Sequence, residues 1–266
     1  MALNWINVEE FSFNSLLMLE KFQIRMLLGY FKNNSRVVGI TLKYNPEVAW
    51  YLGHRCPECN DLVKKMIEEA PNVNDIDEIR KCEIGVMQSI EDFIIYAYPE
   101  LMDTHCNFIY GWDKARLFEL IDFKNKVVLD VGAGNGRLTF AAAEHAKEVY
   151  ACEPVSSLRE YMRDKIARDG ISNVRVVDGT SFVLPYPDDT FDIVMSGHVV
   201  GDDYEKEITE LTRVVKHGGW ILDCPGEDDR DGVLSQELVD CGWEWFYYKS
   251  KFGGDVYRYR KQIWKK

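Results

Sequence analysis

The sequence predicts an α/β protein with a Rossmann-like doubly wound sheet, an antiparallel last strand and an N-terminal helical cap. After residue 110, strand and helix patterns alternate, which is typical of a parallel sheet with crossover helices. A glycine-rich loop follows the first strand of this series. Before residue 110, apolar residues recur at helical spacing. We therefore expect a mainly helical cap at residues 1–109, concerned with substrate, and a cofactor-binding domain at residues 110–266.

The helical cap is predicted from four segments. Residues 15–30 carry apolar side chains at helical spacing. Asn45 before Pro46 is the pattern of an N-cap followed by proline at the first helical position. Residues 61–70 continue the helical pattern, and residues 75–98 are predicted as one long amphipathic helix.

The cofactor-binding domain is predicted from alternating apolar runs. Strands are expected at residues 126–131, 148–152, 174–177, 191–196 and 220–224. Helices are expected at residues 138–146, 155–169, 204–215 and 233–241. Gly218 and Gly219 are predicted to end the third of these helices. The last two strands, 243–249 and 256–264, are joined too closely for a crossover helix, so they form an antiparallel hairpin.

Composition narrows the class of protein and its partners. The chain is 46% hydrophobic and 29% charged, which favours a packed core over disorder. A net charge of -12 makes nucleic acid an unfavourable partner. The most apolar stretch, residues 16–31, contains three charged side chains, so no membrane span is expected. Without a basic leader, and with seven scattered cysteines that form no disulfide pattern, the chain is expected in the cytoplasm.

The strongest motif is the glycine loop Gly132-Ala133-Gly134-Asn135-Gly136, which follows the first strand. Glycines let the chain turn tightly and let a ligand approach the backbone. A dinucleotide loop would have a third glycine where Arg137 stands, so an NAD-dependent oxidoreductase is the disfavoured alternative. Asp130, two residues before the loop, opposes a pyrophosphate and suits a cation. S-adenosylmethionine (SAM), which carries an ammonium and a sulfonium, is therefore the expected cofactor.

Carboxylates also follow the next two strands. Glu153 ends the second strand, where a carboxylate can accept hydrogen bonds from both hydroxyls of a ribose. Asp178, with Gly179 and Thr180, ends the third strand and can place a carboxylate near an adenine amino group. Because ligands of open α/β sheets bind at the carboxyl ends of the strands, these residues are expected at one site.

Residues 126–226 resemble the class I SAM-dependent methyltransferase superfamily, in its small-molecule branch with the ubiquinone-type methyltransferases. The matching pieces, which agree in order and spacing, are Val127–Gly136, Glu153-Pro154, Asp178–Thr180, Leu184–Pro187, Phe191–Ser196 and Leu211–Gly219. The resemblance implies that the glycine loop lines the methionine part of SAM, that Glu153 holds the ribose and that Asp178 faces the adenine. The expected cofactor-binding residues are Asp130, Gly132, Ala133, Gly134, Asn135, Gly136, Glu153, Pro154, Asp178, Gly179, Thr180, Ser196, Gly197 and His198.

The expected reaction is transfer of a methyl group from SAM to a small-molecule acceptor. The protein then mainly orients the reactants, and a base is needed only for an acceptor that must lose a proton. His198, just after the fourth strand, is the candidate base. Oxygen, nitrogen, carbon and sulfur stay open as the acceptor atom. An inactive SAM-binding regulatory module is the alternative function.

The remaining candidates concern substrate, assembly and metal. Tyr110 and Trp112 precede the first strand and are expected to cover the site as a lid. The apolar residues 16–31 are interpreted either as a homodimer face or as internal packing. Cys56 and Cys59 have the spacing of a zinc or dithiol pair, but lack further ligands at matching spacing and a thioredoxin-like context. We expect incidental thiols there and no metal.

Overall fold

The chain divides into two compact units, Met1–Leu101 and Met102–Lys266. The structure is a computed structural model that describes residues 6–31, 35–106, 109, 111–197, 199–201, 203–226 and 232–265. The boundary expected from the sequence, after residue 109, lies further along the chain than the one between the units. Met102 to Cys106 therefore belong to the unit that contains the sheet.

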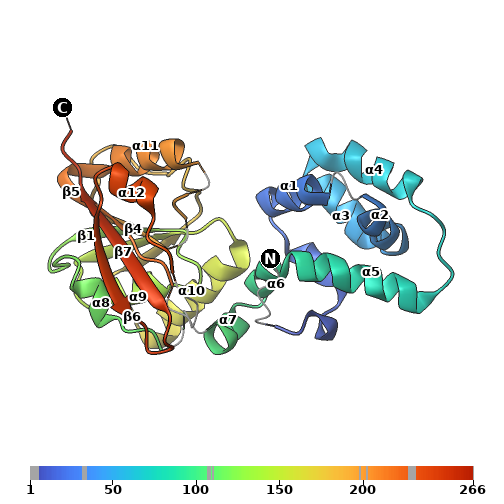
Figure 1. Cartoon of the computed structure of the whole chain (residues 1–266), viewed down its shortest axis with the longest axis horizontal. Coiled ribbons are helices and arrows are strands. Elements are labelled where there is room, and N and C mark those ends of the chain that lie inside the picture. Colours follow the sequence, from blue (N-terminus) through green and yellow to red (C-terminus); the bar gives the residue numbers. More distant parts are fainter. Residues whose placement is uncertain are drawn as a thin grey trace. The chain divides into compact units, whose positions relative to one another are not determined.

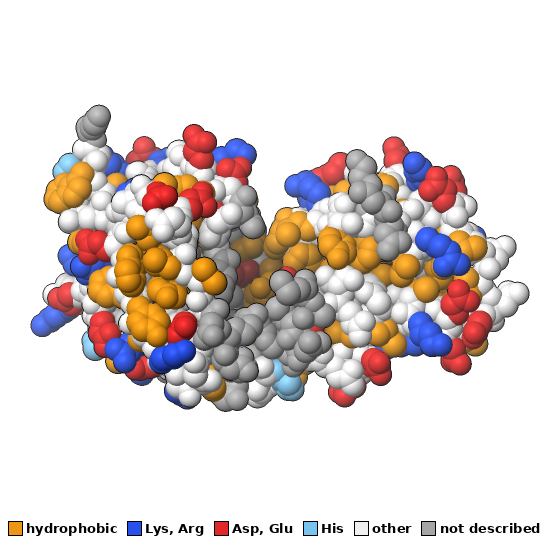
Figure 2. Space-filling model, in the orientation of Figure 1, with side chains coloured by type: hydrophobic (Ala, Val, Ile, Leu, Met, Phe, Trp, Pro, Cys, Tyr) orange, Lys and Arg blue, Asp and Glu red, His pale blue; other side chains and the backbone are white. Residues whose placement is uncertain are grey.

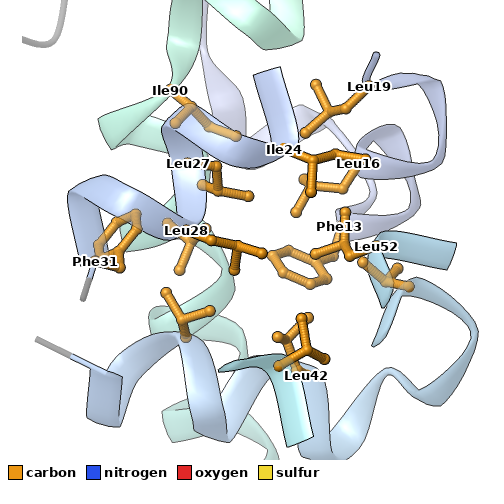
Figure 3. Packing of buried hydrophobic residues seen from close by; sticks show 14 of the residues in the cluster. Phe13, Leu16, Leu19, Ile24, Leu27, Leu28, Phe31, Leu42, Leu52 and Ile90 are labelled. Carbon is orange, nitrogen blue, oxygen red and sulfur yellow. The ribbon is translucent and has the colours of Figure 1, made fainter. Parts of the chain in front are cut away.

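The first unit is helical. Its 3-10 helices are η1 (Val8–Glu10), η2 (Phe13–Met18) and η4 (Pro57–Cys59). Its α-helices are α1 (Lys21–Tyr30), α2 (Ser35–Tyr44), α3 (Pro46–Arg55), α4 (Asn60–Glu69), α5 (Ile76–Ser89) and α6 (Glu91–Tyr96), and α7 (Pro99–His105) leads into the second unit. Apolar side chains of η2 and α1 are buried in the core of this unit (Figure 3), so internal packing accounts for most of the apolar residues in 16–31. Met18, Met26 and Tyr30 are exposed.

One expectation for this unit was wrong, and one helix was not expected. The predicted helix at residues 75–98 is two helices, α5 and α6, because the backbone leaves the helical region at Ile90 (φ -128°, ψ 34°). The helix α2 was not predicted. Its sequence is rich in β-branched residues and contains Gly39, both of which lower intrinsic helix propensity. Tertiary packing outweighs that local preference, since five consecutive residues of α2, Val38 to Leu42, are buried.

Gly39 lies where α2 packs most closely on α4. A Cβ at this position would stand 2.2 Å from the carbonyl oxygen of Met66. Gly39→Ala is therefore expected to lower the free energy of unfolding by roughly 1–3 kcal/mol, the usual cost of overpacking. Gly85→Ala is the matched control, because a Cβ on that α5 glycine meets nothing within 4 Å. Urea unfolding followed by circular dichroism should show the control unchanged or stabilised by up to roughly 1 kcal/mol. Equal effects of the two substitutions would contradict the contact.

The second unit contains a seven-stranded sheet in the order β3-β2-β1-β4-β5-β7-β6. The strands are β1 (Val127–Val131), β2 (Glu148–Cys152), β3 (Val174–Val177), β4 (Phe191–Ser196), β5 (Val215–Asp223), β6 (Glu244–Lys249) and β7 (Asp255–Gln262). The helices are α8 (Ala115–Phe118), α9 (Arg137–Ala143), α10 (Ser156–Asp169), α11 (Tyr204–Val214) and α12 (Gln236–Asp240). β1 to β5 pair in parallel, whereas β7 is antiparallel to both of its neighbours. The predicted doubly wound sheet with an antiparallel end is confirmed (Figure 1).

Helices cover both faces of this sheet. Alternate residues of the central strand face opposite sides, so Val128 packs with α8 and α9, whereas Leu129 packs with α11 and α12. Both faces of the central strands are consequently buried, as their continuous apolar runs predict. β6 forms one edge of the sheet, and Figure 2 shows hydrophobic side chains gathered over the β6–β7 hairpin. Trp245 and Tyr247 of β6 are about half exposed. No helix among the described residues is both long and apolar enough to cross a bilayer.

The prediction that Gly218 and Gly219 end a helix was wrong. α11 ends at Val214, and β5 begins at the next residue and includes both glycines. Gly218 has φ 77°, and the pairing of β4 with β5 shifts register between Phe191 and Ile193. The glycines therefore form an irregularity inside a strand, where their conformational freedom serves a bulge instead of a helix end.

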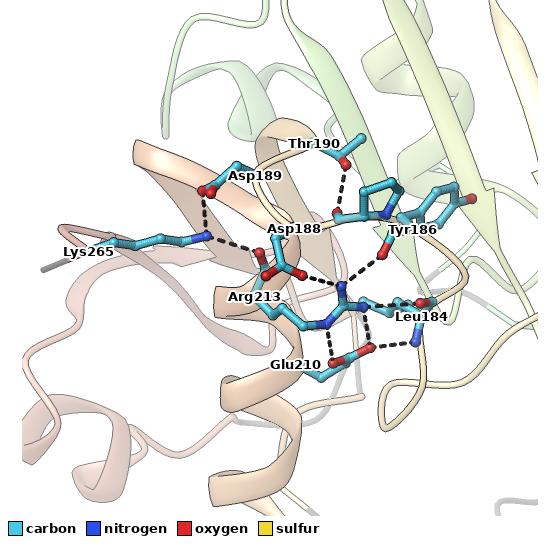
Figure 4. A network of polar contacts seen from close by, with 9 residues as sticks. Leu184, Tyr186, Asp188, Asp189, Thr190, Glu210, Arg213 and Lys265 are labelled. Atoms are coloured by element: carbon cyan, nitrogen blue, oxygen red, sulfur yellow. Dashed lines mark hydrogen bonds and ion pairs between the residues drawn. The ribbon is translucent and has the colours of Figure 1, made fainter.

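Arg213 of α11 fixes the segment that leads into β4 (Figure 4). Its guanidinium donates to the carbonyl oxygens of Leu184 (3.1 Å) and Tyr186 (2.8 Å). It also forms ion pairs with Asp188 at 2.8 Å and Glu210 at 2.7 Å. This network joins Leu184–Pro187 to Leu211–Gly219, two of the sequence pieces that carry the family resemblance, and it positions the start of β4.

Candidate functional site

The glycine loop is fastened to the end of the neighbouring strand β2. The backbone N–H groups of Gly132 and Ala133 both donate to the carbonyl oxygen of Cys152, at 2.8 and 3.1 Å. Gly132, Gly134 and Gly136 all have positive φ, which favours glycine. A Cβ on Gly134 would meet nothing within 4 Å, whereas one on Gly132 or Gly136 would collide with a neighbouring side chain. The loop is thus open to a ligand at Gly134.

Glu153 lies beside this opening. Its Oε2 accepts a hydrogen bond from Gly134 N at 2.8 Å, and its Oε1 accepts one from Val155 N at 2.9 Å. The residue is 4% exposed, and burial raises the pKa of its carboxyl to about 7. Pro154 separates Glu153 from Val155, which is the N-cap of α10. The structure therefore brings together the glycine loop and the carboxylate predicted to hold the ribose.

Asp130 is a buried carboxylate with one unused oxygen. Its Oδ2 accepts a hydrogen bond from Thr139 Oγ1 at 2.6 Å, whereas no described residue donates to Oδ1. Burial raises the pKa of this carboxyl to about 7. A buried acceptor without a donor is costly, and a cationic ligand would satisfy it. This orphaned oxygen and the open Gly134 fit SAM, whose ammonium would supply the missing charge.

Asp178 differs from the other two carboxylates because its side chain is 72% exposed. It forms an ion pair with Arg159 Nη1 at 3.2 Å, and the same nitrogen donates to the carbonyl oxygen of Glu153 at 2.8 Å. Gly179 packs against Cys152, and Thr180 forms a β-bridge with Val183. Arg159, which the sequence analysis missed, ties the ends of β2 and β3 together from the first turn of α10.

Asn135 connects the loop to a residue outside the predicted site. Its amide nitrogen donates to Asp103, and the hydroxyl of Tyr161 donates to the same carboxylate. The sequence analysis placed Asp103 in the helical cap, but it belongs to the second unit. Asp103 therefore anchors the glycine loop to α10, and no short-range pattern identifies it.

The end of β4 places Ser196 and Gly197 beside β5. Ser196 Oγ donates to Asp223 Oδ1 at 3.2 Å. A Cβ on Gly197 would stand 2.7 Å from Arg137 Nη2, which itself donates to the carbonyl oxygen of Cys224 at 2.6 Å. Arg137, whose presence counted against a dinucleotide, thus occupies the space next to Gly197.

Two predicted site residues, His198 and Tyr110, lie outside the described residues. Trp112 lines a cavity of about 390 Å³ together with Asn135 and Arg137. Its ring is faced by the guanidinium carbons of Arg137 and Arg258, at 5.0 and 5.3 Å. These cation–π contacts hold Trp112 against α9 and β7.

Comparison with known proteins agrees with this geometry. Residues 129–222 match the family described as methyltransferase domain. YcgJ of Bacillus subtilis, an uncharacterised methyltransferase, is 32% identical over 111 residues, which are 41% of this chain and 44% of YcgJ. A demethylmenaquinone methyltransferase of a Geobacillus species is 33% identical over 135 residues, 48% of this chain and 58% of the relative. This chain thus spans about half the length of these relatives.

Over residues 129–222 the chain is thus similar to methyltransferase domains. Solved structures of methyltransferases share its fold. A SAM-dependent methyltransferase from Aquifex aeolicus aligns with a TM-score of 0.50 and 20% identity, over 62% of this chain and 98% of that chain. A putative methyltransferase from Methanococcus maripaludis aligns with a TM-score of 0.51 and 17% identity, over 63% of this chain and 91% of that chain. Both of these solved proteins are described as SAM-dependent, and SAM is the cofactor that the loop and its carboxylates predict for this chain.

The Cys56–Cys59 pair lies in the first unit, away from the methyltransferase domain along the sequence. Both residues are buried, and their sulfur atoms are 3.2 Å apart. Burial, with the neighbouring Cys56 thiol, raises the pKa of Cys59 to about 11, so this thiol stays protonated at neutral pH. None of the described His, Cys, Asp and Glu residues form a group of three or more that could hold a metal ion.

Binding of SAM to the methyltransferase domain is expected to release protons near pH 6.5. Asp130 and Glu153 have pKa values of about 7, so each is largely protonated there in the unliganded protein. A bound cation favours the ionised carboxylates and lowers both pKa values. Affinity should therefore rise with pH from 6 to about 7.5 and then level off. Calorimetry in two buffers of different ionisation enthalpy measures the protons released, and Asp130→Asn should reduce their number.

The same pKa values determine how pH affects the unliganded fold. They lie above the ordinary values of 3.8 and 4.5, so the folded state keeps protons that the unfolded state has lost. The contribution of these two groups to the free energy of unfolding is complete below about pH 4 and is lost as pH rises through about 7.

The prediction for SAM binding would be contradicted by either of two results. These are uptake of protons on binding, or a SAM affinity that is independent of pH between 6 and about 7.5.

Proposed function

We propose that this protein is a methyltransferase that transfers the methyl group of SAM to a small-molecule acceptor. The observation that carries the proposal is the pair of buried carboxyls, Asp130 and Glu153, on either side of the glycine loop that opens at Gly134. An unused buried acceptor at such a loop suits a cationic nucleoside and opposes the pyrophosphate of NAD. The match to the methyltransferase family supports the same cofactor.

Each polar group has a proposed task in cofactor binding. Glu153 would accept hydrogen bonds from the ribose hydroxyls, Asp130 would neutralise the ammonium, and Asp178 with Gly179 would face the adenine. Ser196 and Gly197 would lie beneath the cofactor. When bound, SAM supplies a methyl group on a positively charged sulfur that leaves as a neutral sulfide. The protein then has to orient the acceptor and exclude water.

Other parts of the proposal rest on the sequence. His198 is retained as a candidate general base, and Tyr110 and Trp112 as residues that contribute to acceptor binding. The first unit is proposed to influence the choice of acceptor. A cytoplasmic location and a homodimer are also predicted, and nucleic acid is not expected as a partner. The cytoplasmic location is supported by the seven cysteines, which form no disulfide.

The decisive experiment is calorimetric titration of the full chain with SAM and, separately, with NAD. Micromolar affinity for SAM and no measurable binding of NAD are expected. A folded protein that does not bind SAM would show the proposal to be wrong. An assay of S-adenosylhomocysteine release with a panel of small acceptors then separates enzyme from binding module, since a module would bind SAM without turnover.

A further inference from the structure

A cavity of about 410 Å³ opens at the carboxyl ends of β4 and β5, within the second unit. Val200 and Gly201, which follow β4, line one part, and Asp223 and Pro225, at the end of β5, line another. The lining continues onto α12 and β7. Ser196 at the end of β4 contacts Asp223, so the cavity begins next to the strand end proposed to lie beneath SAM. Its volume is that of a small-molecule site.

The described lining combines aromatic rings with carboxylates. Tyr204, Tyr257 and Tyr259 contribute the rings, and no lysine or arginine occurs among the described residues that line the cavity. The carboxylates are Asp223, the exposed Glu237 and Asp255, which forms an ion pair with Lys249. The hydroxyls of Tyr204 and Tyr259 already accept hydrogen bonds from Trp243 Nε1 and Ser235 N, both at 2.8 Å. The carboxylates disfavour phosphorylated or carboxylate-bearing ligands, and the rings favour a flat, aromatic one.

Asp223 is the one buried carboxylate among the three described carboxylates that line this cavity. The residue is 5% exposed, and its Oδ1 accepts the hydrogen bond from Ser196 Oγ. No further hydrogen bond to this carboxylate is made by the described residues, so Oδ2 is an available acceptor in the cavity wall. A nearly buried acceptor beside aromatic rings suits a ligand that brings its own hydroxyl donor.

We propose that this cavity binds the methyl acceptor, that the acceptor is an aromatic molecule with a hydroxyl group and no negative charge, and that Asp223 is the group that takes the hydroxyl proton. This inference rests on the proposed methyltransferase function. A lone pair of the hydroxyl oxygen forms the new bond to the methyl carbon, and the carbon–sulfur bond breaks with its electron pair remaining on sulfur. The hydroxyl proton moves to Asp223 Oδ2. The charges of the carboxylate and the sulfonium are thereby both cancelled.

The surroundings of Asp223 determine the pKa of its carboxyl. Burial raises the pKa of its carboxyl to about 7. Arg137 of α9 and Arg258 of β7 favour its ionised form, whereas Glu207 of α11 opposes it. Further titratable or polar neighbours are Ser196 of β4, Cys224 next in the chain and Tyr259 of β7. The cavity wall also carries the carboxylates of Glu237 on α12 and Asp255 on β7. Above about pH 7 the carboxylate can accept a proton, and a base works best with a pKa near the working pH.

The test uses three probes of nearly equal size on the full chain saturated with S-adenosylhomocysteine. 4-Methylphenol offers a hydroxyl, 4-methylanisole is its methyl ether, and 4-methylbenzoate carries a negative charge. Titration followed by NMR at pH 8 should show the phenol binding about tenfold more tightly than the ether, since it alone can donate to a carboxylate. The benzoate should bind most weakly. The preference for the phenol should shrink at pH 6, where Asp223 is protonated.

Two substitutions locate the effect. Asp223→Ala should abolish both the preference for the phenol and its pH dependence. Val233→Trp should block binding of the phenol, and the fold should tolerate it because Val233 lines the cavity and is 87% exposed. Asp240→Asn, an exposed carboxylate of α12 outside the lining, is the control and should change neither. SAM affinity should survive Val233→Trp.

Three results would overturn the inference. These are equal affinity for phenol and ether, tight binding of the benzoate, or phenol binding that Val233→Trp leaves unchanged. The last of these remains decisive even if Asp223→Ala does not fold. Calorimetry with SAM on the same preparation separates the two proposals, because loss of SAM binding refutes the methyltransferase function. SAM binding without phenol recognition refutes the acceptor site alone.

Discussion

Glu153→Gln is expected to weaken SAM binding about 100-fold. The carboxylate has two oxygens for two ribose hydroxyls, whereas the amide keeps one acceptor and no charge. Hydrogen bonds to a charged group contribute roughly 1.5–3 kcal/mol, and about 2.8 kcal/mol corresponds to a factor of 100. Calorimetric titration of the purified variant with SAM gives the dissociation constant. A change of less than about threefold would show that Glu153 does not hold the cofactor.

The control for this substitution is Glu148→Gln at the opposite end of the same strand. Glu148 contacts Tyr150 and Arg175 at the amino end of β2 and is remote in register from the glycine loop. Glu148→Gln and Glu153→Gln each remove one negative charge, so the two variants are matched in their long-range electrostatic effect on a cationic ligand. SAM affinity should stay within about twofold of the wild type in the control. Circular dichroism of both variants confirms that the fold is retained.

Gly134→Ala should lower SAM affinity at least tenfold, whereas Gly170→Ala should leave it unchanged. The two glycines have similar positive φ values, 58° and 65°, and a Cβ on either meets nothing within 4 Å. The backbone strain of an alanine in this conformation, roughly 1–2 kcal/mol, is therefore common to both variants. Gly170 only ends α10, but Gly134 lies where the ligand must approach the loop. The new methyl group occupies that approach.

Comparing the two variants separates binding from folding. Both should unfold at similar, slightly lower temperatures than the wild type, because the strain is the same. The difference in SAM affinity then reports contact with the ligand. If Gly170→Ala weakened SAM binding as much as Gly134→Ala, the effect would be one of general stability, and the loop would lose its proposed role.

The sheet of the second unit could be predicted because its local patterns agree with its tertiary structure. The apolar run that ends in Asp130 predicts a buried strand, and the glycines after it predict a loop. Gly170 correctly predicted the end of α10, where it adopts a left-handed conformation. Gly218 and Gly219 also predicted the end of a helix, but they lie in β5. Their conformation depends on the pairing of β5 with β4, and a local sequence pattern holds no information about that pairing.

The helical unit was harder to predict for a related reason. α2 has weak local preference and forms because it is buried against α4 and α5, and Gly39 is explained only by the approach of Met66. No proline or glycine stands next to Ile90 in the sequence, so no local pattern predicts the break there. In the candidate site, Asp130 and Glu153 stand at strand ends that the sequence identifies. Asp103, Arg159 and Asp223 act through contacts with residues distant in sequence, so spacing along the chain does not identify them.

The unused oxygen of Asp130 also bears on how a catalytic cycle would end. Among the described residues, Arg159 acts on Glu153 and Asp178, and Arg137 acts on Asp130. Three carboxyls opposed by these two cations leave the ionised site with an excess of negative charge. Such a site attracts a sulfonium compound more strongly than the uncharged sulfide left after methyl transfer. S-adenosylhomocysteine would dissociate more readily than SAM. The acidic residues that favour SAM binding would therefore also limit product inhibition.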